Sequence, residues 1–111
     1  MTGLALSSAA SGLLRALVAR SGASREHILL SDVRSTEWRS LTFSGERHRI
    51  ALRVTGPYAE PYAQRMVHRI EDAEFAIPGV LVADIAVIDG PALLADRSLA
   101  ITLEALTVEG G

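Results

Sequence analysis

The side chains most often used in catalysis and metal binding are few in this 111-residue sequence, and they lie apart from one another. Cysteine is absent, which excludes a thiol nucleophile, a disulfide and a thiolate metal site. The three histidines, His27, His48 and His68, are not spaced like metal ligands. We therefore expect each histidine at an exposed or edge position.

Acidic and hydroxyl side chains give no clearer catalytic pattern. Glu71 with Glu74, or Asp84 with Asp89, could serve general acid and base catalysis, but nothing in the sequence brings either pair into a common cleft. On a helix, Glu71 and Glu74 are expected to face solvent. No serine lies in a GxSxG nucleophile elbow, and the nine glycines form no phosphate-binding loop. We predict no catalytic residue, no cofactor, no bound metal and no enzyme activity.

Arginines are the remaining candidates for a functional role. In the segment 47–54, a strand would place Arg47, Arg49 and Arg53 on one face. The other face would carry His48, Ile50, Leu52 and Val54. Such a face could bind a phosphate backbone, contact an acidic partner, or simply stay hydrated. Trp38, the only tryptophan, is expected to anchor the core or an interface.

Charge is distributed unevenly along the chain, although the net charge is only -2. Residues 1–69 carry ten arginines and five acidic residues, a balance of +5, whereas residues 70–111 carry one arginine and eight acidic residues, a balance of -7. All cationic residues are arginine, which makes flat, bidentate contacts with carboxylate or phosphate. Two interpretations stay open: two hydrated faces of one fold, or two complementary interaction surfaces.

Two amphipathic helices are predicted from the spacing of apolar residues. The first covers residues 4–20 and is closed by Gly22, where a left-handed residue would end it. The second begins at Pro61, which suits the first turn of a helix, and runs to about Phe75. Its apolar stripe consists of Tyr62, Met66, Ile70 and Ala73.

Four strands are predicted between and after these helices, over residues 28–43, 47–54, 80–89 and 98–108. We expect the first strand to be bent or bulged midway. The third is apolar on both faces, which predicts a well-covered strand. Turns are predicted at Ser44–Gly45 and at Asp89–Pro91.

The order α-β-β-α-β-β in a chain of this length predicts one domain, residues 1–111, of the α+β class. Its sheet would be four-stranded and largely antiparallel, with both helices on one face. Leu52, Ile70, Ile85 and Ile101 are predicted to meet in the core between them. We see no signal peptide and no apolar run that could span a bilayer, which predicts synthesis in the cytoplasm.

The order and spacing of these segments resemble the tail terminator proteins of long-tailed phages and of gene transfer agents. The shared pieces are STEWRSLTFSGERHRIALRV at Ser35–Val54, a short loop and helix, VLVADI, a DG turn, and LAITLEALTVE. Together they cover about Ile28–Glu109. Two departures occur: the segment before the first strand is reduced to SGASREH, and Thr55–Gly56 stands where Trp-Ser often closes the second strand.

The resemblance implies a structural virion protein that forms a ring, expected to be a hexamer, at the head-proximal end of the tail tube. The ring would stop tube growth and join the tail to the head connector. Its partners would be other copies of itself, the tail tube protein, the head-side connector or stopper protein, and DNA passing through the lumen, with no membrane. Under this interpretation Arg47, Arg49, Arg53 and Trp38 are candidate subunit-interface or lumen residues.

Two other functions stay open from the sequence. A small oligomeric α+β ligand-binding domain would need a pocket with converging polar groups, for which the sequence offers no candidate set. A nucleic-acid-associated domain would combine its arginines with stacking aromatic residues. Here the aromatic residues do not interleave with the arginines, and a pI of about 5.9 disfavours strong binding.

Overall fold

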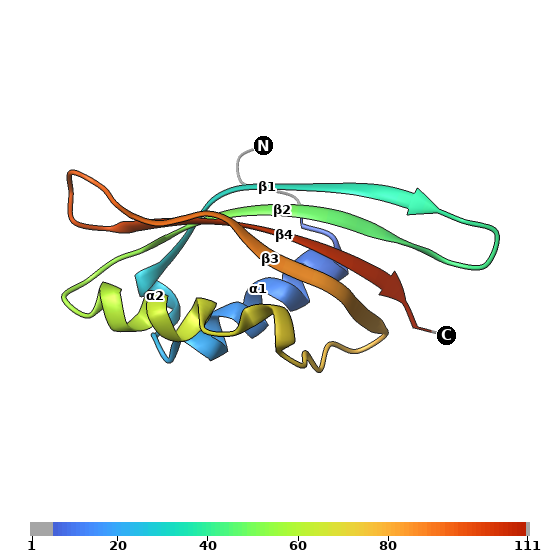
Figure 1. Ribbon diagram of the computed structural model, residues 1–111, viewed down its shortest axis with the longest axis horizontal. Helices are drawn as coiled ribbons and strands as arrows, with labels where there is room; N and C mark the ends of the chain where they lie inside the picture. The colour runs from blue at the N-terminus through green and yellow to red at the C-terminus, as the bar shows by residue number, and fades with distance from the viewer. Residues whose placement is uncertain (1–5, 111) are drawn as a thin grey trace.

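A computed structural model describes residues 6–110 and contains the predicted elements in the predicted order. The α-helices are α1 (Ser8–Ser21) and α2 (Ala59–Val67), and the strands are β1 (Ile28–Arg39), β2 (Ser44–Val54), β3 (Val80–Leu93) and β4 (Leu99–Glu109). The 3-10 turn η1 (Arg25–His27) precedes β1, and η2 (Ile70–Asp72) follows α2. The strands form one antiparallel sheet in the order β1-β2-β4-β3, and both helices lie on one of its faces (Figure 1). The predicted α+β class is confirmed.

The core lies between the helices and the sheet face that they cover. Alternation along β2 and β4 turns every second side chain toward the helices, where α1 and α2 contribute Leu13, Leu17 and Met66. All four residues predicted to share the core are buried in it: Leu52, Ile70, Ile85 and Ile101. The prediction of one common core is confirmed.

The helix ends follow local sequence signals. The Oγ atom of Ser7 accepts a hydrogen bond from the N–H of Ala10 and caps α1, while Gly22 closes the helix with a φ of 74°, as predicted. The predicted start at Leu4 lies outside the described residues. The second helix ends at Val67 rather than Phe75, because Arg69 has a φ of 49° and the chain continues as η2.

The first predicted turn was misplaced. Ser40 and Phe43 close the connection between β1 and β2, with the Ser40 N–H donating to the Phe43 carbonyl oxygen at 2.8 Å. Ser44 and Gly45 instead begin β2, and Gly45 lies opposite Trp38. A Cβ atom on Gly45 would collide with the Thr107 carbonyl oxygen, so glycine serves close strand packing here rather than a turn. β1 does contain a register shift, but it lies between Leu30 and Asp32, near the beginning of the strand rather than midway as predicted.

The expectation of a well-covered third strand was wrong. β3 lies at an edge of the sheet, and most of its side chains are exposed. It continues through the predicted turn at Asp89–Pro91 to Leu93, and the chain reverses at residues 94–98. Proline is tolerated within β3 because an edge strand leaves some backbone positions unpaired, and the register is irregular there.

Two arginines join the C-terminal ends of the helices. Arg20 at the end of α1 donates from Nε to the Met66 carbonyl oxygen and from Nη2 to that of His68, at 3.1 and 2.6 Å. Arg65 in α2 donates to the carbonyl oxygen of Ser21 at 3.2 Å. Each guanidinium therefore satisfies carbonyl oxygens that the other helix leaves without a partner.

Candidate interaction surface on the outer sheet face

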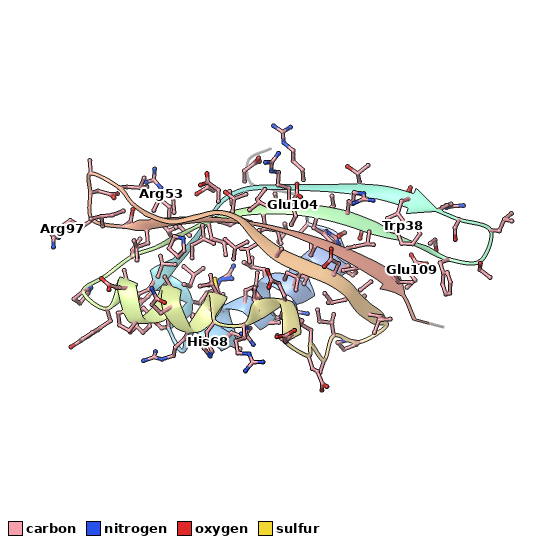
Figure 2. All side chains as sticks on the ribbon, viewed as in Figure 1. Trp38, Arg53, His68, Arg97, Glu104 and Glu109 are labelled. Carbon is pink, nitrogen blue, oxygen red and sulfur yellow. The ribbon has the colours of Figure 1, made fainter. Side chains whose placement is uncertain are left out.

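The sheet face opposite the helices, here called the outer face, carries the arginines predicted from the sequence. Arg47, Arg49 and Arg53 all point to this side of β2, as predicted, and Arg34 of β1 lies directly opposite Arg49. We call these four residues the basic strip. Arg53 and Glu104 are labelled in Figure 2, where both lie on the side of the sheet away from the helices.

Acidic side chains occupy the other half of the outer face. Glu104 of β4 lies opposite Arg49, and Asp84 and Asp89 of β3 lie one strand further away. We call these three residues the acidic strip. Because the strand order is β1-β2-β4-β3, the basic and acidic parts of the sequence become two neighbouring halves of one surface.

Ion pairs within the chain use only part of this charge. Arg49 Nε lies 3.9 Å from a Glu104 carboxylate oxygen at the boundary between the strips, and Arg34 Nε lies 3.4 Å from Asp32. Such exposed pairs contribute little to folding stability. Within residues 6–110, Arg47, Asp84 and Asp89 form no ion pair. Charge of both signs therefore remains for a partner.

A depression of about 340 Å³ crosses the boundary between the two strips. Arg47 and Arg49 line one side of it, and Asp84 and Glu104 line the other. Ile88, which is 41% exposed, adds an apolar contact surface. This arrangement suits recognition of a surface that itself carries both charges.

Trp38, the fourth candidate interface residue, lies opposite Gly45, two residue pairs beyond Arg47 toward the end of β1. Its Nε1 atom is buried and forms no hydrogen bond with any residue in the described range 6–110. The indole lies against Gly45, where a Cβ atom would be 3.1 Å from Nε1. Arg47 and Arg49 are thus close neighbours, whereas Arg53 and Trp38 lie toward opposite ends of β2.

His48 is buried, so the expectation of an exposed or edge position was wrong for this residue. It is 2% exposed, with Nδ1 2.8 Å from Ser35 Oγ and Nε2 2.9 Å from Thr107 Oγ1. Thr107 Oγ1 donates in turn to the carbonyl oxygen of Glu46 at 3.3 Å. Burial lowers the pKa of His48, and the nearby carboxylate of Glu46 opposes this shift.

These hydrogen bonds define the role of His48. The hydroxyl of Thr107 is used toward Glu46, so Nε2–H of His48 donates to Thr107 Oγ1 and Nδ1 accepts from the Ser35 hydroxyl. A serine beside an imidazole is also found in hydrolases, but there a carboxylate usually orients the ring, and here a threonine takes that place. His48, Ser35 and Thr107 thus form a hydrogen-bonded bridge that joins β2 to β1 and β4.

The other sequence candidates are dispersed. His68 is exposed, and His27 is half-buried and stacks on Tyr62 with 6.0 Å between ring centroids. Glu71 and Glu74 are exposed, as expected. No group of three potential metal-binding side chains occurs within residues 6–110. In the same range, no helix has the length and apolarity needed to cross a membrane.

Two exposed apolar residues were missed as functional candidates, because Leu41 and Phe43 were assigned to a strand rather than to a turn. The sequence did contain a signal for a turn with exposed apolar side chains, because these two large apolar residues lie between Ser40 and Ser44.

No family model, curated protein or solved structure matches the chain. Hypotheses about function depend on the order of the sequence segments and on the surfaces described above.

Proposed function

We propose that this chain is a structural protein of the tail terminator type. It assembles as a ring at the head-proximal end of a tail tube, stops the growth of the tube and joins the tail to the head connector. The sequence resemblance over Ile28–Glu109 motivates the proposal. The structural observation that supports it is the division of the outer face into a basic and an acidic strip.

A ring made from one kind of subunit needs two different contact surfaces on each copy. The basic strip lies toward the β1 edge of the sheet, and the acidic strip lies toward the β3 edge. The basic side of one copy can therefore contact the acidic side of the next, and the last copy can contact the first. Arg47, Asp84 and Asp89 would supply charges that are not used within the chain.

The function is tested by mixing the purified protein with its cognate tail tube subunit and observing the products by electron microscopy. We expect tubes of limited length with added density at one end. Tubes that reach the same length with and without the protein, and that carry no density at either end, would overturn the proposal.

The ring contact is tested by charge reversal. Arg47→Glu with Arg49→Glu should shift the mass distribution measured by sedimentation toward the monomer, most strongly at low salt, where repulsion is least screened. Arg15→Glu with Arg25→Glu is a matched control, because both arginines are exposed outside the basic strip and the total charge change is the same.

A mixing experiment separates a specific contact from a general effect of charge. Asp84→Arg with Asp89→Arg should also prevent assembly, because it leaves two basic halves. Mixed with the Arg47→Glu and Arg49→Glu variant, it should assemble again through contacts between unlike copies. If the charge-reversed variants assemble as the parent does, the two strips are hydrated surfaces and not the ring contact.

A further inference from the structure

The hairpin of β1 and β2 projects from one end of the molecule beyond the helices (Figure 1). We call its outer part, residues 37–46, the arm. Leu41 in its turn is fully exposed and Phe43 is 58% exposed. Ser40 fixes the turn, because its N–H donates to the Phe43 carbonyl oxygen and its Oγ accepts from the Phe43 N–H. The arm thus presents two apolar side chains on a hydrogen-bonded turn.

The base of the arm is attached to the body of the sheet. Ser44 Oγ donates to a carboxylate oxygen of Glu109 in β4 at 2.8 Å, and Gly45 and Glu46 lie opposite Val108 and Thr107 of β4 in the sheet. These contacts hold the arm in line with the sheet. The exposed apolar side chains therefore have a defined position relative to the rest of the chain.

The opposite end of the molecule, here called the far end, offers a surface of matching chemistry. The loop after β2 and the turn before β4 meet there around a hollow of about 390 Å³. Two apolar or aromatic side chains are exposed beside these segments, Tyr58 at 63% and Leu93 at 70%. In Figure 2, Arg97 marks this end, and Trp38, which belongs to the arm, lies toward the opposite end.

Charge also differs between the two ends. The arm region carries the carboxylates Glu37, Glu46 and Glu109 against a single arginine, Arg39. At the far end, Arg97 forms no ion pair with any residue in the described range. Asp96 is already engaged there, since it accepts two hydrogen bonds from Ser98 and lies 3.6 Å from Arg53. These hydrogen bonds lower the pKa of Asp96.

We propose that the arm of one copy docks on the far end of a second copy of this chain. Leu41 and Phe43 would contact Leu93 and Tyr58, with the carboxylates of the arm near Arg97. Each copy gives one arm and receives one, so the contact is heterologous and compatible with a closed ring. The inference rests on the proposed function only in assuming that copies of this chain associate, and not on the role at the tail tube.

The first test removes the apolar groups of the arm. Leu41→Ser with Phe43→Ser changes exposed side chains, so the fold should persist, as circular dichroism and thermal unfolding can verify. We expect the dissociation constant between copies, measured by sedimentation, to rise roughly tenfold or more. Thr42→Ala is the matched control, because it alters the same turn and keeps both apolar side chains; it should associate as the parent does.

The second test locates the contact and uses the absence of cysteine from the chain. Phe43→Cys and Leu93→Cys are prepared separately, with a size tag on one of them, and then mixed under oxidising conditions. We expect disulfide-linked dimers that contain one copy of each variant. Phe43→Cys alone should form few dimers, because two arm tips do not meet in a heterologous contact.

The outcomes distinguish this inference from the proposed function. If the parent associates and the Leu41→Ser, Phe43→Ser variant associates equally well, the arm contact is wrong and the ring through the charged strips stands. Predominant dimers of Phe43→Cys with itself would also overturn the contact. A parent that stays monomeric at every concentration overturns both the arm contact and the ring. Tube capping is measured separately and tests only the terminator role.

Discussion

Arginine has different roles on the two sides of the sheet. On the helix side, Arg20 donates two hydrogen bonds to carbonyl oxygens at the end of α2, and Arg65 donates one to the end of α1. On the outer face, Arg47 and Arg49 are exposed, and only a 3.9 Å contact joins Arg49 to Glu104. The same residue type thus completes the fold on one side and leaves charge for a partner on the other.

The difference arises from what surrounds each guanidinium group. Helix ends provide carbonyl oxygens without partners inside the helix, and a cation near them is favourable for the helix dipole. A strand within a sheet has already used its carbonyl oxygens in the ladder, so an outward-facing arginine finds only solvent or neighbouring side chains. Changes on the helix side should therefore reduce folding stability, whereas changes on the outer face should affect association.

The largest expected effect comes from truncating an apolar side chain on the covered face. Ile101 is 1% exposed within the core, so Ile101→Ala should lower the free energy of unfolding by about 2–5 kcal/mol, because it leaves a cavity. Ile88→Ala is the matched control, since it removes the same atoms from a partly exposed position on β3 and should cost clearly less. Chemical denaturation of both variants measures the difference, and equal losses would mean that the two faces are wrongly assigned.

A smaller effect is expected from the arginines themselves. Arg20→Ala removes two hydrogen bonds from a charged donor and should lower the free energy of unfolding by about 1.5–3 kcal/mol. Arg47→Ala changes an exposed side chain and should stay within about 0.5 kcal/mol of the parent. Urea denaturation at a concentration where the protein is monomeric isolates folding from association. The contrast between the two sides would be lost if Arg47→Ala cost as much as Arg20→Ala.

Much of the fold could be predicted because hydrophobic periodicity reports which side chains face the core. It placed Arg47, Arg49 and Arg53 on the face opposite Leu52. The end of α1 at Gly22 was predicted separately, from the left-handed conformation that glycine adopts at helix ends. Hydrophobic periodicity could not show that β3 is an edge strand. An apolar run is compatible with cover on both faces, and strand order depends on pairings between distant segments.

The surface was less predictable than the fold. The sequence showed that the chain has a basic and an acidic part, but only the strand order makes these parts neighbours. His48 was misjudged because its two hydrogen-bond partners lie 13 and 59 positions away in the sequence, and because its burial depends on the helices that cover this face. The turn was misplaced because Gly45 signals a turn as readily as the close approach of β4.

The smallest expected effect is a pH dependence of stability that arises from His48 on the covered face. Burial lowers the pKa of His48 below its ordinary value of 6.5, so between the two values the unfolded chain binds more protons than the folded protein. The contribution of His48 to the free energy of unfolding therefore rises with pH across this window and is fully present above pH 6.5. One proton limits the slope to about 1.4 kcal/mol per pH unit.

Denaturation at a series of pH values between roughly 5 and 7.5, above the range in which most carboxylates titrate, measures this slope. His48→Gln keeps an amide that can donate and accept hydrogen bonds but cannot be protonated in this range, so we expect the slope to disappear. A variant with His27→Gln and His68→Gln should keep it, because those histidines lie outside the hydrogen-bonded bridge. The opposite pattern, with a slope that survives His48→Gln and is lost in the double variant, would assign the pH dependence to the two histidines outside the bridge. In that case a charged imidazole would destabilise the fold no more at the buried position of His48 than at the half-buried and exposed positions of His27 and His68.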